Sequence, residues 1–203
     1  MLGRVHLITD SGPGSDPVEQ VRTLLPVATP DLVVQFRPAG QWCDRVVFEA
    51  ATEIVELCRT RSVKVLINDR VHIAVAVDAD GAHVGADDLP VPAARRLLGP
   101  ERILGATART PAVAHAAMAE GADYVGVGPC YPSFTKRGLP QPLGPQGVAA
   151  IAPYARVIAI GGVTHERVAA LLDAGAHGVA VIGAVRDAPC PATALANLLD
   201  LVQ

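Results

Sequence analysis

The sequence predicts an α/β protein folded as a single closed (β/α)₈ barrel, a TIM barrel, that spans residues 1–203. Short Val-, Ile- and Leu-rich runs recur about every 25 residues, and longer Ala-rich segments of helical periodicity separate them. No Pro-, Gly- or Ser-rich linker divides the chain. The length of 203 residues is short for this fold, so the helices and loops must be trimmed. A doubly wound open sheet is the alternative.

Eight apolar runs are the strand candidates, because each is short, rich in β-branched residues and bounded by turn-forming residues. They cover residues 5–10, 31–37, 63–69, 81–85, 102–107, 123–130, 157–162 and 178–185. Eight strands that alternate with helices are the number that closes a parallel barrel.

The segments between these runs carry helix signals. The clearest candidates are residues 43–61, 110–122 and 164–176. Thr110 and Thr164 stand where N-caps belong, and Gly121 and Gly175 stand where helices end. Each of these segments is therefore expected to be a helix that returns the chain to the next parallel strand.

Composition excludes several classes of protein. Half of the residues are hydrophobic (50%) and 18% are charged, which is unlike a disordered chain or a coiled coil. A net charge of -3 gives no field that would gather nucleic acid or anionic lipid, so neither is an expected partner. The chain has no long apolar stretch, its start reaches Asp10 too early for a signal peptide, and its four cysteines form no CxxC pair. We expect reduced thiols and a cytoplasmic protein.

Polar side chains gather at the carboxyl ends of the predicted strands, where barrels of this kind build their active sites. They are Gln35, Arg37, Asn68, Asp69, Asp87, Asp88 and Thr107, with the glycine pair Gly161 and Gly162 at the end of the seventh run. The sequence thus predicts one polar mouth on the barrel.

Two carboxylates in this set suit a metal ion. Asp69 and Asp88 would approach each other from neighbouring strands beside Asn68, and hard oxygen ligands of this kind bind Mg²⁺. Helix capping is the alternative for either aspartate, and Asp87 is expected to be solvated. His83 lies inside the fourth run and is expected either to point into the barrel near this site or to be a hydrogen-bonded core residue.

A long irregular segment follows the sixth run. Residues 129–144 contain four prolines together with Ser133, Thr135, Lys136 and Arg137. Hydroxyl groups and cations suit an anionic ligand, so we expect a lid over a phosphate; a solvated surface loop is the alternative. The glycines of residues 159–164 and 180–185 suit a second phosphate contact through backbone N–H groups.

Several motifs in this order identify a family resemblance. They are HLITD, VQFR, LINDR, HVGADDLP, GADYVGVGPCYPSFTK and AIGGV, and together they cover about residues 5–185. Their order resembles the thiamine phosphate synthase family, within the superfamily that also contains the thiazole tautomerases. That family has a (β/α)₈ fold and joins hydroxymethylpyrimidine diphosphate to a thiazole phosphate in thiamine biosynthesis, with release of pyrophosphate and use of Mg²⁺.

The resemblance implies a role for each matching residue, and the partners it implies are phosphorylated small molecules. The diphosphate would be held by Gln35, Arg37, Asn68 and Lys136, and the catalytic cations would be Arg37 and Lys136. Asp69 and Asp88 would ligate the metal, and His83 and Thr107 would contact the substrate near the pyrimidine. The thiazole phosphate would be held by Ser133, Thr135, Gly162, Ile182 and Gly183.

The chain departs from the family at a few positions. The family's diphosphate strand reads Q-x-R-x-K, whereas this chain has Ala39 at the lysine position, so a cation is missing. The family's glutamine in the HLGQ pattern is Ala86, its serine after the last strand is Gly183, and its lid threonine is Ser133. The missing cation predicts that this chain binds the diphosphate more weakly than the family does.

Two other functions stay open. A thiazole tautomerase would carry a histidine where this chain has Pro129, and that family tends to lose the two metal acids that this chain keeps. A paralogue that binds thiamine precursors without turnover would tolerate the Ala39 substitution. The sequence leaves the oligomeric state open, a homo-oligomer included.

Overall fold

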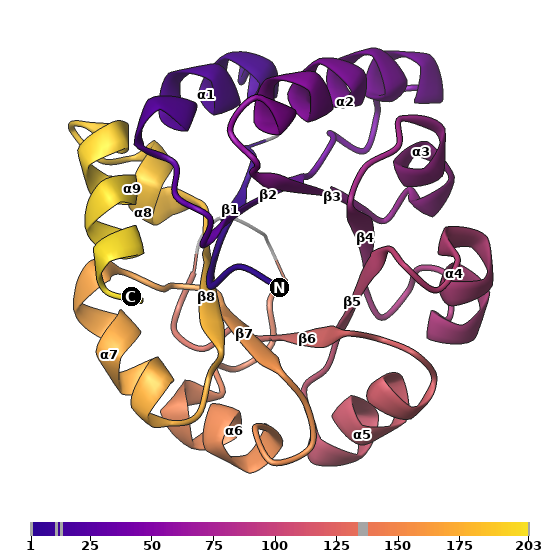
Figure 1. Ribbon diagram of the computed structural model, residues 1–203. Helices are drawn as coiled ribbons and strands as arrows, with labels where there is room; N and C mark the ends of the chain where they lie inside the picture. Colours follow the sequence, from indigo (N-terminus) through magenta and orange to yellow (C-terminus); the bar gives the residue numbers. More distant parts are fainter. Residues whose placement is uncertain (1, 11, 13, 134–137, 203) are drawn as a thin grey trace.

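The computed structural model describes residues 2–10, 12, 14–133 and 138–202. Its strands form one closed parallel barrel in chain order, in which β8 pairs with β1. Figure 1 shows this barrel with the helices in a ring around it. The predicted (β/α)₈ barrel is confirmed, and the open sheet is excluded.

The eight strands fall within the predicted runs but are shorter. They are β1 (Val5–Ile8), β2 (Leu32–Phe36), β3 (Lys64–Asn68), β4 (Gly81–Val84), β5 (Ile103–Thr107), β6 (Tyr124–Val127), β7 (Val157–Ile160) and β8 (Gly178–Val181). The apolar runs overestimate the lengths of the strands, because the last residues of most runs already belong to the loops. Asp69 follows β3 with φ 64°, and Gly161 and Gly162 follow β7 with φ of 90° and 65°.

The helices surround the barrel and bury one side each against it. They are α1 (Pro17–Leu24), α2 (Asp44–Arg59), α3 (Val71–Ala76), α4 (Val91–Leu98), α5 (Pro111–Ala119), α6 (Gly144–Ile151), α7 (His165–Asp173), α8 (Gly183–Arg186) and α9 (Pro191–Asp200), with a 3₁₀ turn η1 (Leu25–Val27). The Thr110 side chain caps α5 by accepting from the Val113 N–H. Thr164 occupies the N-cap of α7 without a capping bond to the described backbone.

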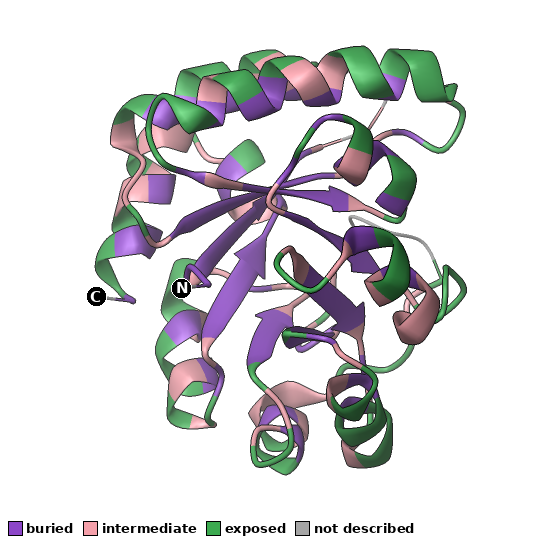
Figure 2. Ribbon diagram, turned by 45° about the vertical axis from the view of Figure 1, so that its right-hand side comes forward, coloured by how far each residue is buried: buried purple, intermediate pink, exposed green. Residues whose placement is uncertain are grey.

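Two apolar clusters alternate along the strands. One lies between strands and helices and includes Leu7, whereas the inner one includes Ile8, the next residue of β1. This alternation follows from side chains that point to opposite faces of a strand. The other inner-cluster residues are Leu2, Val33, Leu66, Tyr124, Ile158, Ala180 and Ile182. Figure 2 shows buried strands inside helices with exposed outer faces.

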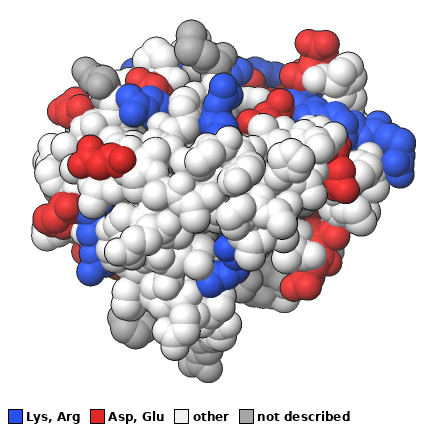
Figure 3. Space-filling view, turned by 90° about the horizontal axis from the view of Figure 1, so that it is seen from below, with Lys and Arg blue, Asp and Glu red and all other residues white. Residues whose placement is uncertain are grey.

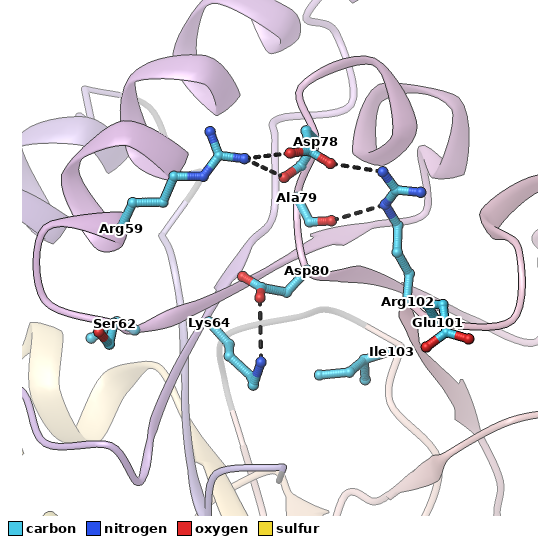
Figure 4. A pocket seen from close by; sticks show the side chains of 10 residues that line it. Arg59, Ser62, Lys64, Asp78, Ala79, Asp80, Glu101, Arg102 and Ile103 are labelled. Atoms are coloured by element: carbon cyan, nitrogen blue, oxygen red, sulfur yellow. Dashed lines mark hydrogen bonds and ion pairs between the residues drawn. The ribbon is translucent and has the colours of Figure 1, made fainter.

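A cavity of about 630 Å³ lies at the N-terminal ends of β3, β4 and β5. Five of its charged side chains form ion pairs with one another (Figure 4). Asp78 pairs with Arg59 at 2.7 Å and with Arg102 at 2.8 Å, and Lys64 lies 3.3 Å from Asp80. Asp80 also accepts the Val65 N–H at 2.8 Å. In this fold that end of the barrel carries stability rather than chemistry, and the mutual pairing fits this role.

The described surface carries mixed charges. On the face drawn in Figure 3, cationic and acidic side chains are interspersed around a largely uncharged area. Among the described residues, no helix combines the length and apolar character that crossing a membrane requires.

Candidate active site

The structure brings the predicted polar residues to one end of the barrel. Asn68 ends β3 and pairs in register with His83 of β4, which pairs in turn with Gly105 of β5. Thr107 is the last residue of β5, and Arg37 directly follows β2. Because all strands are parallel, these carboxyl ends share one mouth.

The residues differ in depth within this mouth. Gln35 and His83 are buried, at 4% and 8% exposure, whereas Arg37, Asn68 and Thr107 are half-buried. The sequence groups Gln35 with the diphosphate ligands, yet the structure places it in the barrel interior beneath them. Charged ligand groups can reach the half-buried layer, and an uncharged ring suits the buried one.

Thr9, a residue that sequence reasoning missed, holds the end of β2 in place. The Thr9 N–H donates to the Gln35 carbonyl at 3.0 Å, and its side-chain oxygen accepts the Arg37 N–H at 3.0 Å. Thr9 is fully buried. It therefore extends the pairing of β1 and β2 by one residue and sets the direction in which the chain leaves with Arg37.

Asp69 and Asp88, the predicted metal ligands, are both exposed at the ends of neighbouring strands. The Asp69 N–H donates to the His83 carbonyl at 2.8 Å, which anchors the turn after β3 to β4. Asp88 Oδ2 accepts the Gly85 N–H at 2.8 Å, a bond within the loop after β4 and not the helix cap that the sequence kept as an alternative. The other carboxylate oxygen of Asp88, Oδ1, takes no part in that bond.

The donor chemistry of this corner fits Mg²⁺. Two exposed carboxylates and the Asn68 amide are hard oxygen ligands, and Mg²⁺ in proteins is commonly held by one or two carboxylates with waters and phosphate oxygens. Within the described parts of the chain, no three His, Cys, Asp or Glu side chains form a cluster that could hold a metal. A cation here would thus take further oxygen ligands from water or from a substrate phosphate.

His83 sits in a buried hydrogen-bonded group. Its Nδ1 lies 3.0 Å from the Tyr124 hydroxyl oxygen, and its Nε2 lies 3.1 Å from Thr107 Oγ1. Burial lowers the pKa of His83 to about 4, partly offset by the charge of Asp88. His83 is therefore neutral near pH 7, and it is both inward-pointing and hydrogen-bonded, which joins the two readings that the sequence kept apart.

The segment after β6 packs against the glycine pair after β7. A Cβ at Gly161 would lie 2.6 Å from Pro129, and one at Gly162 would lie 2.4 Å from the Pro132 carbonyl oxygen. These glycines therefore allow a close approach of two loops. The Arg167 guanidinium strengthens the contact by donating to the Gly162 carbonyl at 2.6 Å and lying 4.5 Å from the Tyr131 ring centre.

A cavity of about 260 Å³ adjoins this contact and is lined by Ser133, Pro129, Pro132 and Pro140 among others. Ser133 thus lies within the predicted lid segment, residues 129–144. Thr135, Lys136 and Arg137 lie outside the described residues. On the other side of β7, Ile182 and Gly183 join β8 to α8, and Ile182 is buried in the inner cluster.

Ala39 is not an open position at the mouth. It is 6% exposed, and its carbonyl accepts the Trp42 N–H at 3.0 Å in a turn before α2. Position 39 is therefore buried in the turn that follows Arg37. The chain after Arg37 turns inward, and a longer side chain at position 39 would need its neighbours to move.

Two aromatic residues of the barrel interior escaped the sequence reasoning. Tyr124 is buried at the start of β6, and His6 lies beneath it on β1, with ring centres 5.2 Å apart. Each lies in an apolar run, and the alternation of side chains along the run says only which face of the strand a residue is on, not what it contacts. The signal that could have found Tyr124 is the pair of strand glycines, Gly105 and Gly126, which leave room for large neighbours.

Comparison with known proteins agrees with this geometry. The sequence matches the family described as thiamine monophosphate synthase over residues 5–185. A thiamine-phosphate synthase of Salinispora arenicola is 50% identical over 98% of this chain and 97% of its own length. One of Salinibacter ruber is 42% identical, over 97% of this chain and 87% of its own.

A solved structure supports the same assignment. Thiamine phosphate pyrophosphorylase from Pyrococcus furiosus superposes with a TM-score of 0.85 at 30% identity, covering 98% of this chain and 95% of its own. The predicted resemblance and the predicted thiamine-phosphate synthase function are confirmed by these matches. By its motifs, its fold and its relatives, the chain belongs to the thiamine monophosphate synthase family.

Proposed function

We propose that the polar mouth joins hydroxymethylpyrimidine diphosphate to a thiazole phosphate. The thiazole nitrogen attacks the pyrimidylmethyl carbon, a C–N bond forms, the C–O bond to the diphosphate breaks, and pyrophosphate leaves with the bonding electron pair. The observation that carries this proposal is the layered mouth, with an uncharged buried layer below and cationic and acidic groups above it.

The upper layer suits the diphosphate. Arg37 and Asn68 stand half-buried at the ends of adjacent strands. A guanidinium can donate to two phosphate oxygens at once, and an amide N–H adds a neutral donor. Lys136 is proposed as the second cation, from its place in the family motif. These donors oppose the negative charge that grows on the leaving group.

Asp69 and Asp88 are the residues that would hold Mg²⁺. When bound there, the ion would supply positive charge to the diphosphate oxygens. Asn68, the last residue of β3, would orient the same group.

The lower layer suits the pyrimidine ring. Gln35 and His83 of this layer, with the half-buried Thr107 at its edge, offer uncharged hydrogen-bonding groups around the ring, and Tyr124 lies below. A neutral His83 adds no positive charge beside a reacting carbon that becomes cation-like as the diphosphate leaves.

Burial raises the pKa of the Cys130 thiol to about 11, so this thiol is protonated and is a poor nucleophile. Direct transfer between the two substrates fits such a site.

The other end of the mouth is proposed to hold the thiazole phosphate. Ser133 lies in the lid segment, Gly162 lies against Tyr131 and Pro132 just before Ser133, and Ile182 and Gly183 stand at the neighbouring strand end. Thr135 is proposed to join them. Hydroxyl and backbone N–H donors bind a phosphate without adding charge near the reacting carbon.

The test is direct conversion. Purified protein with Mg²⁺ and both precursors is expected to form thiamine phosphate and pyrophosphate in equal amounts, and to form neither when one precursor is omitted or the metal is chelated. Isomerisation of a thiazole phosphate without pyrophosphate would instead identify a tautomerase. Saturable binding of precursors without product would identify a non-catalytic binder.

We expect Ala39→Lys to weaken the protein rather than restore a family contact. A lysine at this buried position overpacks the turn and desolvates an ammonium group, so stability should fall by about 1–3 kcal/mol. The Michaelis constant for the diphosphate substrate should not fall. Denaturant unfolding and titration of both substrates measure the two effects.

Gly40→Lys is the matched control, because Gly40 is exposed and nothing lies within 4 Å of a Cβ built there. This variant should keep the parental stability. An Ala39→Lys protein of parental stability, with a lower Michaelis constant for the diphosphate substrate alone, would show that position 39 faces the ligand after all.

A further inference from the structure

Four side chains from four strands form a hydrogen-bonded chain through the upper barrel interior. Gln35 Nε2 lies 3.5 Å from the Tyr124 hydroxyl oxygen, which lies 3.0 Å from His83 Nδ1. His83 Nε2 lies 3.1 Å from Thr107 Oγ1, and Thr107 is half-buried at the mouth. The chain therefore links a buried phenol on β6 to a hydroxyl that a ligand can reach.

Glycines on the neighbouring strands make room for its two rings. A Cβ at Gly105 would lie 2.2 Å from the Tyr124 ring and 2.4 Å from its hydroxyl oxygen. A Cβ at Gly126 would lie 3.1 Å from His83 Cε1. Both rings thus occupy space that a side chain at position 105 or 126 would need. The barrel backbone therefore fixes where the two rings lie.

The direction of the chain follows from the donors available. His83 is buried, at 8% exposure, and its two ring nitrogens face hydroxyl oxygens and no carboxylate among the described residues, so the imidazole is neutral. A neutral imidazole has one N–H donor and one acceptor nitrogen. The Gln35 amide N–H₂ faces the Tyr124 oxygen, which leaves the phenol hydrogen for His83 Nδ1. A phenol is also a stronger donor than an imidazole N–H.

With Nδ1 accepting, the imidazole hydrogen must be on Nε2. It then donates to Thr107 Oγ1, whose own hydrogen remains for a further partner. Among the described residues, the structure gives Thr107 Oγ1 no other hydrogen-bond partner than His83. Thr107 thus presents a donor to the mouth, and the opposite orientation of the chain would present an acceptor.

We propose that Tyr124 is a positioning and specificity residue, which holds His83 as the Nε2–H tautomer so that Thr107 offers a hydrogen to an acceptor nitrogen of a heteroaromatic ring. The choice of ring rests on the proposed function: an aminopyrimidine carries ring nitrogens that accept and an exocyclic amine that donates. The tautomer itself depends only on this chain. The site would accordingly read a ring nitrogen and not the amine at Thr107.

The tautomer is measurable in the ligand-free protein. Histidine labelled with ¹⁵N gives different ring signals for the Nδ1–H and Nε2–H forms, and loss of one signal set in His83→Gln assigns those of His83. We expect the Nε2–H pattern in the parent, and in Tyr124→Phe a shift of the Nδ1 signal toward that of an imine nitrogen without a donor. An Nδ1–H pattern in the parent, or an unchanged Nδ1 signal in Tyr124→Phe, would overturn the proposal.

Kinetics test the consequence at Thr107. Tyr124→Phe keeps the ring contact with His6 and removes only the hydroxyl, so we expect kcat/KM for the pyrimidine diphosphate to fall by about 3- to 10-fold, as one hydrogen bond allows. The Michaelis constant for the thiazole phosphate should be unchanged. Tyr154→Phe is the matched control, since Tyr154 is 49% exposed on the surface. An equal loss in Tyr154→Phe, or equal changes for both substrates, would contradict the proposal.

A rescue variant separates positioning from packing. The amide nitrogen of glutamine can take the place of the imidazole Nε2, so His83→Gln should keep more activity than His83→Ala, and Tyr124→Phe should add less than a 2-fold loss in that background. A full additional loss would show that Tyr124 acts elsewhere. If the protein forms no thiamine phosphate while the ¹⁵N signals are as expected, the proposed function fails and the tautomer assignment stands.

Discussion

Asp69→Asn is expected to reduce Mg²⁺-dependent turnover by about 100- to 1000-fold, the range seen when a group that stabilises developing charge is removed. Asp69 is exposed at the mouth, so replacing its carboxylate leaves the barrel core untouched. Asparagine is the better substitution because residue 69 has φ 64°, a left-handed conformation that Asn tolerates and Ala does not. Initial rates over a series of Mg²⁺ concentrations, with a thermal melt of each protein, measure the effect.

Asp87→Asn is the control for the loss of a nearby acidic charge, since Asp87 is exposed beside Asp88 and has no assigned role at the metal. It should retain parental rates. If Asp69→Asn turned over like the parent, or if it melted far below the parent, Asp69 would be a structural residue of the turn after β3.

The stability of the protein is expected to fall steeply as the pH drops below about 6.5. Burial lowers the pKa of His6 to about 3 and that of His83 to about 4. In the unfolded chain, each histidine binds a proton near pH 6.5. In the folded protein, each of these two histidines stays neutral until the pH falls to its own lowered pKa. Each histidine should thus remove about 2 kcal/mol between about pH 7.5 and about pH 5.

His6→Leu should remove about half of that pH dependence. Both His6 ring nitrogens are buried without a hydrogen-bond partner among the described residues, and the nearby Gly3 backbone offsets only part of the effect of burial on the pKa. A leucine should therefore also raise stability near neutral pH, by about 1 kcal/mol or more. Denaturant unfolding at several pH values measures both effects.

His115→Leu, which removes an exposed histidine, is the matched control and should give the parental slope. The expectation would be wrong if His6→Leu lost stability at neutral pH and kept the parental slope, because His6 would then have a partner and a proton in the folded state.

The strand ends carried most of the site information in the sequence. Arg37, Asn68, Asp69 and Thr107 each follow or end an apolar run, and parallel strands must bring such ends to one mouth. The local sequence predicts this placement because the alternation of side chains and the point where a strand ends are both visible in a short stretch of sequence. Thr110 was likewise predictable as a cap, since capping needs only its own helix.

Depth within the mouth was not predictable in this way. Gln35 lies in β2 and Arg37 directly follows that strand, yet Gln35 is buried and Arg37 is half-buried. Whether a strand residue reaches solvent depends on where the neighbouring strands and loops end, which is a contact between distant segments. The burial of Ala39 was not evident either, because it depends on a turn in which the Trp42 N–H donates to the Ala39 carbonyl.

By itself, the sequence determined the eight-stranded parallel barrel, the end of the barrel that holds the polar residues, and the family. Those features depend on hydrophobic periodicity and on motifs that are continuous in the chain. Only the tertiary structure decided that Tyr124, His83 and Thr107 form one buried hydrogen-bonded chain. Its members come from three strands and meet in space left by Gly105 and Gly126, and the low dielectric of that interior makes both rings neutral and their hydrogen-bond direction definite.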